Sequence, residues 1–360
     1  MSGRRRPGAA VVHEAPPPGR PVLSVRDLVV VFDGPHGPLR AVDGVSFDVW
    51  PNEVLGIVGE SGSGKSLTML AVMGLLPPGA RVESGSIEFR GRDMVALPWE
   101  QRRQVLGKEI AMIFQDPMTS MNPVMKIGRQ LAEAIRLHAR ELSRAQVQAR
   151  AAELLALVRI PDAQRRLTAY PHELSGGMRQ RVMIAMAVAH DPALLIADEP
   201  TTALDVTIQA QVLRVLRRIR SQVGASMTLI THDLGLVAES ADRVVVMYGG
   251  RVMETGTVEQ VFAAPAHPYT AGLLASSLRV DGPLDEAYAI PGTPPQVDAR
   301  PAGCVFSPRC PVGGHRDLCR ADKPGLHTDE AGHGVACHYS GETSAWVELS
   351  RRPSDAAVGT

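Results

Sequence analysis

The stretch "GESGSGKS" at residues 59–66 decides the fold. It fits the pattern G-x-x-x-x-G-K-[S/T]. The continuous apolar run "EVLGIVG" (53–59) precedes it and is typical of a buried strand, and "SLTMLAVMGLL" (66–76) follows with helical periodicity. A strand, a glycine-rich loop and a helix in this order predict a loop that binds phosphate at the N-terminus of a helix.

The residue types of this loop fit phosphate chemistry. The glycines let the backbone turn its N–H groups toward an anion, Lys65 would reach the β- and γ-phosphates, and the Ser66 hydroxyl would bind Mg²⁺. The expected ATP-binding residues here are Gly59, Glu60, Ser61, Gly62, Ser63, Gly64, Lys65, Ser66 and Leu67. The alternative is a flexible Gly/Ser turn. Lysine occurs at only four positions of the chain, which favours a specific role for Lys65.

Two carboxylates end another apolar run, "ALLIADEP" (193–200). Asp198 is expected in the Mg²⁺ shell, and Glu199 is expected to polarise the attacking water. The alternative is a helix N-terminus with solvated acids. His232, at the end of "SMTLITH" (226–232), is a third polar group at the carboxyl end of a predicted strand, where it could contact the γ-phosphate.

The pattern of elements predicts an α/β fold. Residues 23–50 resemble antiparallel strands, and later apolar runs at 108–115, 193–200, 226–232 and 242–250 predict buried strands, several of them followed by helices. Such alternation favours a parallel sheet with helices on both faces. The charged helical pattern from Met125 to Arg166 predicts an all-helical insertion.

Composition narrows the class of protein. The 38 basic and 38 acidic residues cancel, so no overall basic field favours nucleic acid or anionic lipid. Residues 1–22 contain arginines but no apolar core, which indicates a disordered tail and not a signal peptide. No apolar run approaches the roughly 20 residues that span a bilayer, so a membrane function would require other chains.

The stretch "LSGGMRQR" (174–181) resembles the signature motif of ATP-binding cassette (ABC) proteins. Met178 stands where many members have glutamine, as is common in the similar peptide-importer subfamily. Other family elements occur in the expected order: Phe32 as the adenine-stacking aromatic, Gln115 as the Q-loop glutamine, Asp205 in "ALD" (203–205) as the D-loop, and His232 as the switch histidine. For Phe32, a core position is the alternative.

The resemblance implies a nucleotide-binding domain over residues 23–265, with a helical subdomain at about 116–190. It implies that Gln115 also contacts Mg²⁺, and that Leu174, Ser175, Gly176 and Gly177 contact the ATP of a second subunit. Because the signature opens a helix, it would form a second anion-binding helix terminus. ATP would then join two subunits head to tail, and hydrolysis would separate them.

All four cysteines lie in the last fifth of the chain, at Cys304, Cys310, Cys319 and Cys337. With "HPYTAGLLAS" (267–276) and "IPGTPP" (290–295), this region resembles the C-terminal extension of the ATPases of oligopeptide, dipeptide and nickel importers. That resemblance implies a [4Fe–4S] cluster on the four cysteines; Zn²⁺ and four unrelated reduced thiols are the alternatives. The extension is expected to span 266–345, before a tail at 346–360, and to be held by something other than a core.

The resulting prediction is an ATP-hydrolysing subunit of a peptide-type ABC importer on the cytoplasmic face of the membrane. Its expected partners are a second, homologous ATPase subunit (an F-type subunit, or a second copy), two permeases and a binding protein, and no nucleic acid. Import of nickel or another small solute, a soluble non-transport ABC ATPase, and a nucleotide-gated subunit with little hydrolysis are the alternatives.

Overall fold

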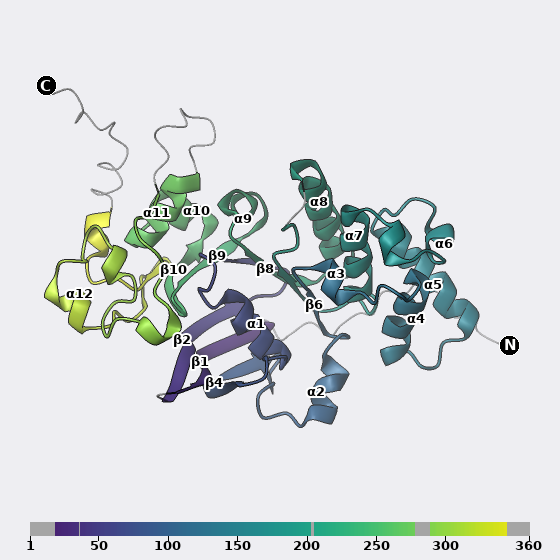
Figure 1. Cartoon of the computed structure of the whole chain (residues 1–360), viewed down its shortest axis with the longest axis horizontal. Helices are drawn as coiled ribbons and strands as arrows, with labels where there is room; N and C mark the ends of the chain where they lie inside the picture. The colour runs from purple at the N-terminus through teal and green to yellow at the C-terminus, as the bar shows by residue number, and fades with distance from the viewer. Residues whose placement is uncertain (1–18, 36, 203–204, 278–288, 344–360) are drawn as a thin grey trace, which may run out of the picture. The chain divides into compact units, whose positions relative to one another are not determined.

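The computed structural model describes residues 19–35, 37–202, 205–277 and 289–343 of the chain (Figure 1). The two predicted tails therefore lie almost wholly outside the described residues. The chain forms two compact units: unit 1 holds residues 1–23, 49–52 and 89–228, and unit 2 holds 24–48, 53–88 and 229–360. The chain passes from unit 1 into unit 2 within strand β8 (Ser226–Thr231).

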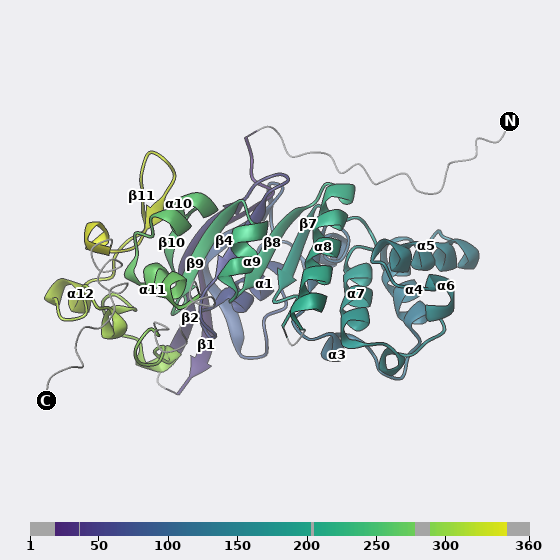
Figure 2. The ribbon, with the colours of Figure 1, turned by 90° about the horizontal axis from the view of Figure 1, so that it is seen from above.

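Unit 1 combines a parallel strand pair with helices. Strands β6 (Ile110–Ile113) and β7 (Leu194–Asp198) are fully buried and pair in parallel, as expected of interior strands. Figure 2 shows helices α4, α5, α6 and α7 gathered together, and α4, α5 and α7 contact one another. The elements of this unit are β5 (Arg92–Asp93), α2 (Trp99–Val105), α3 (Pro117–Ser120), α4 (Ile127–His138), α5 (Arg144–Leu157), α6 (Ala163–Arg166), a 3₁₀ turn (Pro171–Glu173), α7 (Gly176–Ala187) and α8 (Val206–Val223).

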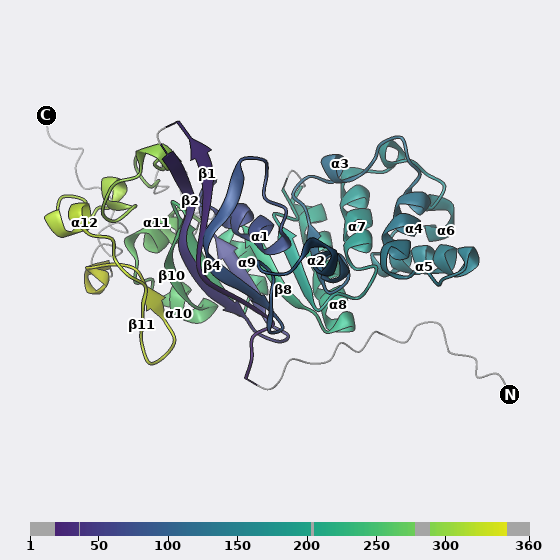
Figure 3. The same ribbon diagram turned by 90° about the horizontal axis from the view of Figure 1, so that it is seen from below.

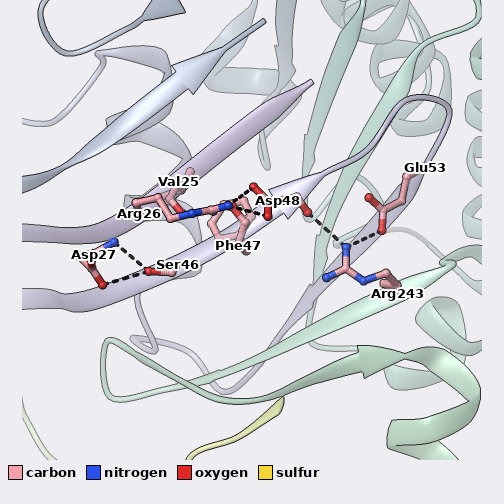
Figure 4. Close-up of polar contacts among 8 residues, drawn as sticks. All are labelled: Val25, Arg26, Asp27, Ser46, Phe47, Asp48, Glu53 and Arg243. Carbon is pink, nitrogen blue, oxygen red and sulfur yellow. Dashed lines mark hydrogen bonds and ion pairs between the residues drawn. The ribbon is translucent and has the colours of Figure 1, made fainter. Parts of the chain in front are cut away.

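In unit 2, strands β2 (Gly37–Val49), β1 (Leu23–Gly34) and β4 (Ala80–Phe89) lie side by side in that order (Figure 3). The guanidinium of Arg26 on β1 donates to both carboxylate oxygens of Asp48 on β2, at 2.7 Å each. The backbone N–H of Asp27 donates to the Ser46 hydroxyl at 2.8 Å, so side chains reinforce this strand pair (Figure 4).

A second run of strands in unit 2 follows the order β11 (His327–Thr328), β12 (Gly334–Val335), β10 (Arg251–Thr257), β9 (Arg243–Tyr248) and β3 (Val54–Val58). Strands β3 and β9 pair in parallel, while β10 and β12 add antiparallel strands. Arg243 on β9 donates to the Glu53 carboxylate at 3.0 Å, just before β3 (Figure 4). The helices of this unit are α1 (Lys65–Met73), α9 (Leu234–Ser240), α10 (Val258–Ala263), α11 (Pro268–Ser277) and α12 (Asp317–Ala321).

The C-terminal extension does have a core, so the expectation that it lacks one is wrong. Phe306 is 1% exposed and packs with Tyr248 of β9 and Tyr269 of α11 in one apolar cluster. Strand β12 also pairs with β10. The extension supplies few apolar side chains, but it buries them against those of the preceding domain, which a segment judged by its own composition does not reveal.

Candidate functional site

The phosphate loop lies between β3 and α1, as the sequence predicts. The Lys65 ammonium folds back over the loop and donates to the carbonyl oxygens of Gly59 at 2.7 Å and Glu60 at 2.9 Å, and to the Ser63 hydroxyl at 3.2 Å. Lys65 is only 5% exposed. The loop therefore already surrounds the Lys65 ammonium with oxygen atoms. A bound nucleotide phosphate would replace these oxygen atoms as the partner of the ammonium.

Glycine is required at particular positions of this loop. Gly59 has φ +151°, and a Cβ atom there would lie 2.1 Å from the carbonyl oxygen of Met247 on β9. Gly64 precedes α1 in the left-handed conformation, with φ +97°. Gly64 is the N-cap of α1 and makes no side-chain capping hydrogen bond, which suits an anion site at this helix N-terminus.

In unit 1, the structure brings Gln115 and Glu199 together. The Gln115 side-chain amide donates to Oε2 of Glu199 at 3.0 Å, and the Thr202 hydroxyl donates to the same oxygen at 2.8 Å. Glu199 follows Asp198, the buried last residue of β7, and has φ +45°. A non-glycine residue in this conformation is uncommon, and such conformations are found often at active sites.

The signature residues open helix α7. Ser175 and Gly176 are exposed, while Leu174 and Gly177 are buried. The Ser175 hydroxyl caps the helix by accepting from the Met178 N–H at 3.4 Å. A Cβ on Gly177 would lie 2.5 Å from Ile208 of α8, so glycine allows the two helices to approach. The signature thus begins helix α7 with two exposed residues, and its contact with ATP stays a prediction.

Three further predicted residues lie at the ends of elements or on a strand. Asp205 caps α8 by accepting from the Ile208 N–H at 3.0 Å; the other two residues of its motif, 203 and 204, lie outside the described residues. His232 is exposed directly after β8, and Phe32 is half-buried on β1. Their contacts with nucleotide stay predictions.

The four cysteines line one small pocket in unit 2, together with His267 and Tyr339. Burial raises the pKa of the Cys304 thiol to about 11 and that of Cys337 to about 12, and it also raises the pKa of Cys310 and Cys319. The cavity measures about 10 Å³, room for about one water molecule. In the described part of the chain, no three cysteine, histidine or acidic side chains converge closely enough to bind a single metal ion.

Sequence reasoning missed several residues that hold these sites. Thr202 orients Glu199, and the side-chain amide of the buried Gln180 donates to the Pro200 carbonyl at 2.7 Å, which ties α7 to the segment after the carboxylates. Tyr269 and Arg309 contact Glu60. The contacts of Glu60 join stretches more than 200 positions apart, and no pattern of spacing indicates them.

Two family models match the chain. The model described as "ABC transporter" matches residues 42–202, and the model described as "Oligopeptide/dipeptide transporter, C-terminal region" matches residues 253–317. The first contains the phosphate loop, the signature and both carboxylates, and the second contains Tyr269, Arg309 and two of the cysteines.

Several curated relatives are similar over most of their length. A probable peptide ABC transporter ATP-binding protein of Sinorhizobium fredii is 50% identical over 89% of this chain and 96% of its own length. The dipeptide transport ATP-binding protein DppD of Escherichia coli is 49% identical over 88% and 96%. The oligopeptide transport ATP-binding protein AppD of Bacillus subtilis is 46% identical over 90% and 98%.

Solved structures confirm the predicted fold class. The dimeric ATP-binding cassette MJ0796, solved with ADP and Pi, superposes with a TM-score of 0.59 at 22% identity, over 66% of this chain and 98% of its own. The protein cbiO1 of Clostridium perfringens gives a TM-score of 0.58 at 26% identity, over 68% and 91%. In the described part of this chain, no helix is both long enough and apolar enough to cross a bilayer.

Proposed function

The chain belongs to the ABC transporter family of ATP-binding proteins, and from this premise we propose that it hydrolyses ATP to drive the import of peptides. The observation that carries the proposal is that one chain joins a preformed phosphate loop to a C-terminal region of the oligopeptide/dipeptide transporter type. Relatives named for peptide, dipeptide and oligopeptide transport support the same substrate class.

The predicted residues divide the chemistry of hydrolysis. Lys65 and the N–H groups of the loop bind the phosphates of ATP, and Ser66, Gln115 and Asp198 would hold Mg²⁺, which neutralises phosphate charge when bound. Glu199, oriented through Gln115 and Thr202, accepts a proton from the attacking water. His232 contacts the γ-phosphate, and Phe32 stacks on the adenine.

The exposed signature serves a neighbouring subunit. Its helix terminus is a second phosphate site in a chain that already has one, which is useful if two subunits enclose each ATP between them. ATP then favours the closed pair, and hydrolysis releases it. The second subunit is a homologous F-type ATPase or another copy. The pair acts on two permeases at the cytoplasmic face of the membrane, and a separate binding protein delivers the substrate to these permeases.

The proposal is tested by reconstituting the subunit with its cognate permeases and partner ATPase in vesicles. We expect ATP-dependent uptake of labelled peptides that Lys65→Ala and Ser175→Ala each abolish, while Ser143→Ala, which removes a cap on a different helix, leaves uptake unchanged. Uptake of nickel or another small solute without peptide uptake would favour the alternative substrates. ATP turnover that is indifferent to both substitutions would refute the mechanism.

We further propose that the four cysteines hold a [4Fe–4S] cluster. Their placement around one pocket fits a four-thiolate site, and a cluster holds its thiolates farther apart than a single Zn²⁺ ion does. The pocket must widen to admit it, because it now has room for about one water molecule. Anaerobic purification with iron and acid-labile sulfide assays tests this: zinc without sulfide would reject the cluster, and four titratable thiols without metal would reject both.

A further inference from the structure

Glu60, the second residue of the phosphate loop, is held by the C-terminal extension. All of its polar groups have partners in unit 2: its N–H donates to the Tyr269 hydroxyl, its carbonyl accepts from Lys65, and its carboxylate pairs with Arg309. We propose that Tyr269 and Arg309 are positioning residues for ATP, which act through Glu60 and make nucleotide affinity depend on the C-terminal extension. This inference rests on the proposed ATP site.

Tyr269 is a rigid support for the loop. Its hydroxyl accepts from the Glu60 N–H at 2.8 Å, and the residue is fully buried. Its ring packs against Tyr248 and Phe306, with ring centroids 4.6 Å and 5.3 Å away. Because this aromatic cluster is closely packed, the hydroxyl has little freedom to move, and the start of the loop is fixed with it.

Arg309 connects Glu60 to Tyr248 and to the segment 290–291 of the extension. Its Nη1 donates to the Glu60 carboxylate at 2.8 Å and to the Tyr248 hydroxyl at 3.2 Å. Its Nε and Nη2 donate to the carbonyl oxygens of Pro291 and Ile290. The side chain is 6% exposed, against 24% for Glu60, so water screens this ion pair only in part.

The charge of Glu60 makes the pairing matter for nucleotide binding. Its carbonyl shares the Lys65 ammonium, so its carboxylate belongs to a loop that must accept a highly anionic ligand. An unpaired carboxylate there would repel the phosphates, and Arg309 neutralises it. Losing Arg309 should therefore weaken ATP binding, and removing the Glu60 charge as well should restore part of it.

The test measures MgATP affinity and steady-state kinetics of the full transporter for four variants: Arg309→Met, Glu60→Gln, the double variant, and Arg316→Met. Arg316 is the matched control, because it lies in the same extension and forms a bidentate pair with Glu342 at 2.6 and 2.8 Å. We expect Arg309→Met to raise the Kd and KM for ATP about tenfold with little change in kcat. The loss should shrink at high salt, and the double variant should bind ATP more tightly than Arg309→Met.

Several outcomes would overturn the inference. It fails if Arg309→Met keeps the parental KM, if Arg316→Met weakens ATP binding equally, or if the double variant is no better than Arg309→Met. Should Arg309→Met not fold, Tyr269→Phe removes a single oxygen, and an unchanged KM in that variant would also overturn it. A parent protein that does not bind ATP, or whose binding survives Lys65→Ala, would refute the proposed function instead.

Discussion

Replacing Glu199 with glutamine should stop hydrolysis while sparing the fold. The carboxylate accepts two hydrogen bonds on Oε2, from Gln115 and Thr202, and a glutamine carbonyl oxygen can accept the same two. Glutamine also tolerates the φ of +45° about as well as glutamate does. We therefore expect the unfolding free energy to change by less than about 0.5 kcal/mol. The loss of the general base should lower the hydrolysis rate roughly 10²- to 10⁴-fold.

Single-turnover phosphate release measures this rate, and size-exclusion chromatography in MgATP measures pairing. The variant should retain ATP and accumulate as the closed pair, because the step that separates the subunits is blocked. Glu153→Gln is the control, since it removes the same charge from an exposed ion pair on α5 and should hydrolyse ATP at the parental rate. A Glu199→Gln variant as fast as the parent would show that this residue is not the base.

Gly59→Ala should abolish ATP binding and destabilise the fold, because its Cβ would meet the Met247 carbonyl. Gly62→Ala has open space around it and should cost only about 1 kcal/mol of strain. Denaturant titration compares the unfolding free energies of the two variants. Phe306→Ala should lower the free energy of unfolding by about 3–5 kcal/mol. It should also speed the reaction of the four cysteines with a thiol reagent in native buffer. Unchanged reactivity would contradict the core that the extension shares with the preceding domain. Burial and a neighbouring histidine lower the pKa of His138 below 6.5, so near this pH the unfolded chain binds more protons than the folded one, and stability should fall as pH drops through 6.5. His138→Gln should reduce the dependence of the melting temperature on pH. An identical dependence in the variant and the parent would contradict this assignment.

Local motifs made part of the site predictable. The loop at 59–66 and the carboxylates at 198 and 199 each lie beside an apolar strand, and the structure places them where β3 and β7 end. Such sites follow from short stretches whose geometry is set by neighbouring residues in the chain. Gln115 and Glu199 contact each other, and their roles toward Mg²⁺ and water stay predictions.

Contacts between distant stretches could not be predicted in this way. Arg309 lies 249 positions after Glu60, and neither residue carries a local signal of the other. Tyr269 lies 209 positions after Glu60, and its hydroxyl still accepts a hydrogen bond from the Glu60 N–H. His333 lies 79 positions after Glu254 and carries no local signal of it, yet it pairs with this fully buried carboxylate at 2.8 Å. Burial and pairing arise from the folded chain, and single-sequence patterns carry little information about them.

The pairing of β12 with β10 affects how the chain tolerates shortening. Ala336 donates its N–H to the Met253 carbonyl at 2.8 Å, and Glu254 and Thr255 pair with Val335 and Gly334. A protein cut before residue 327 would present the backbone of β10 as an open sheet edge, which invites association with another chain. Truncations meant to isolate the ATPase domain should therefore aggregate, and affinity tags belong beyond the last described residue, 343.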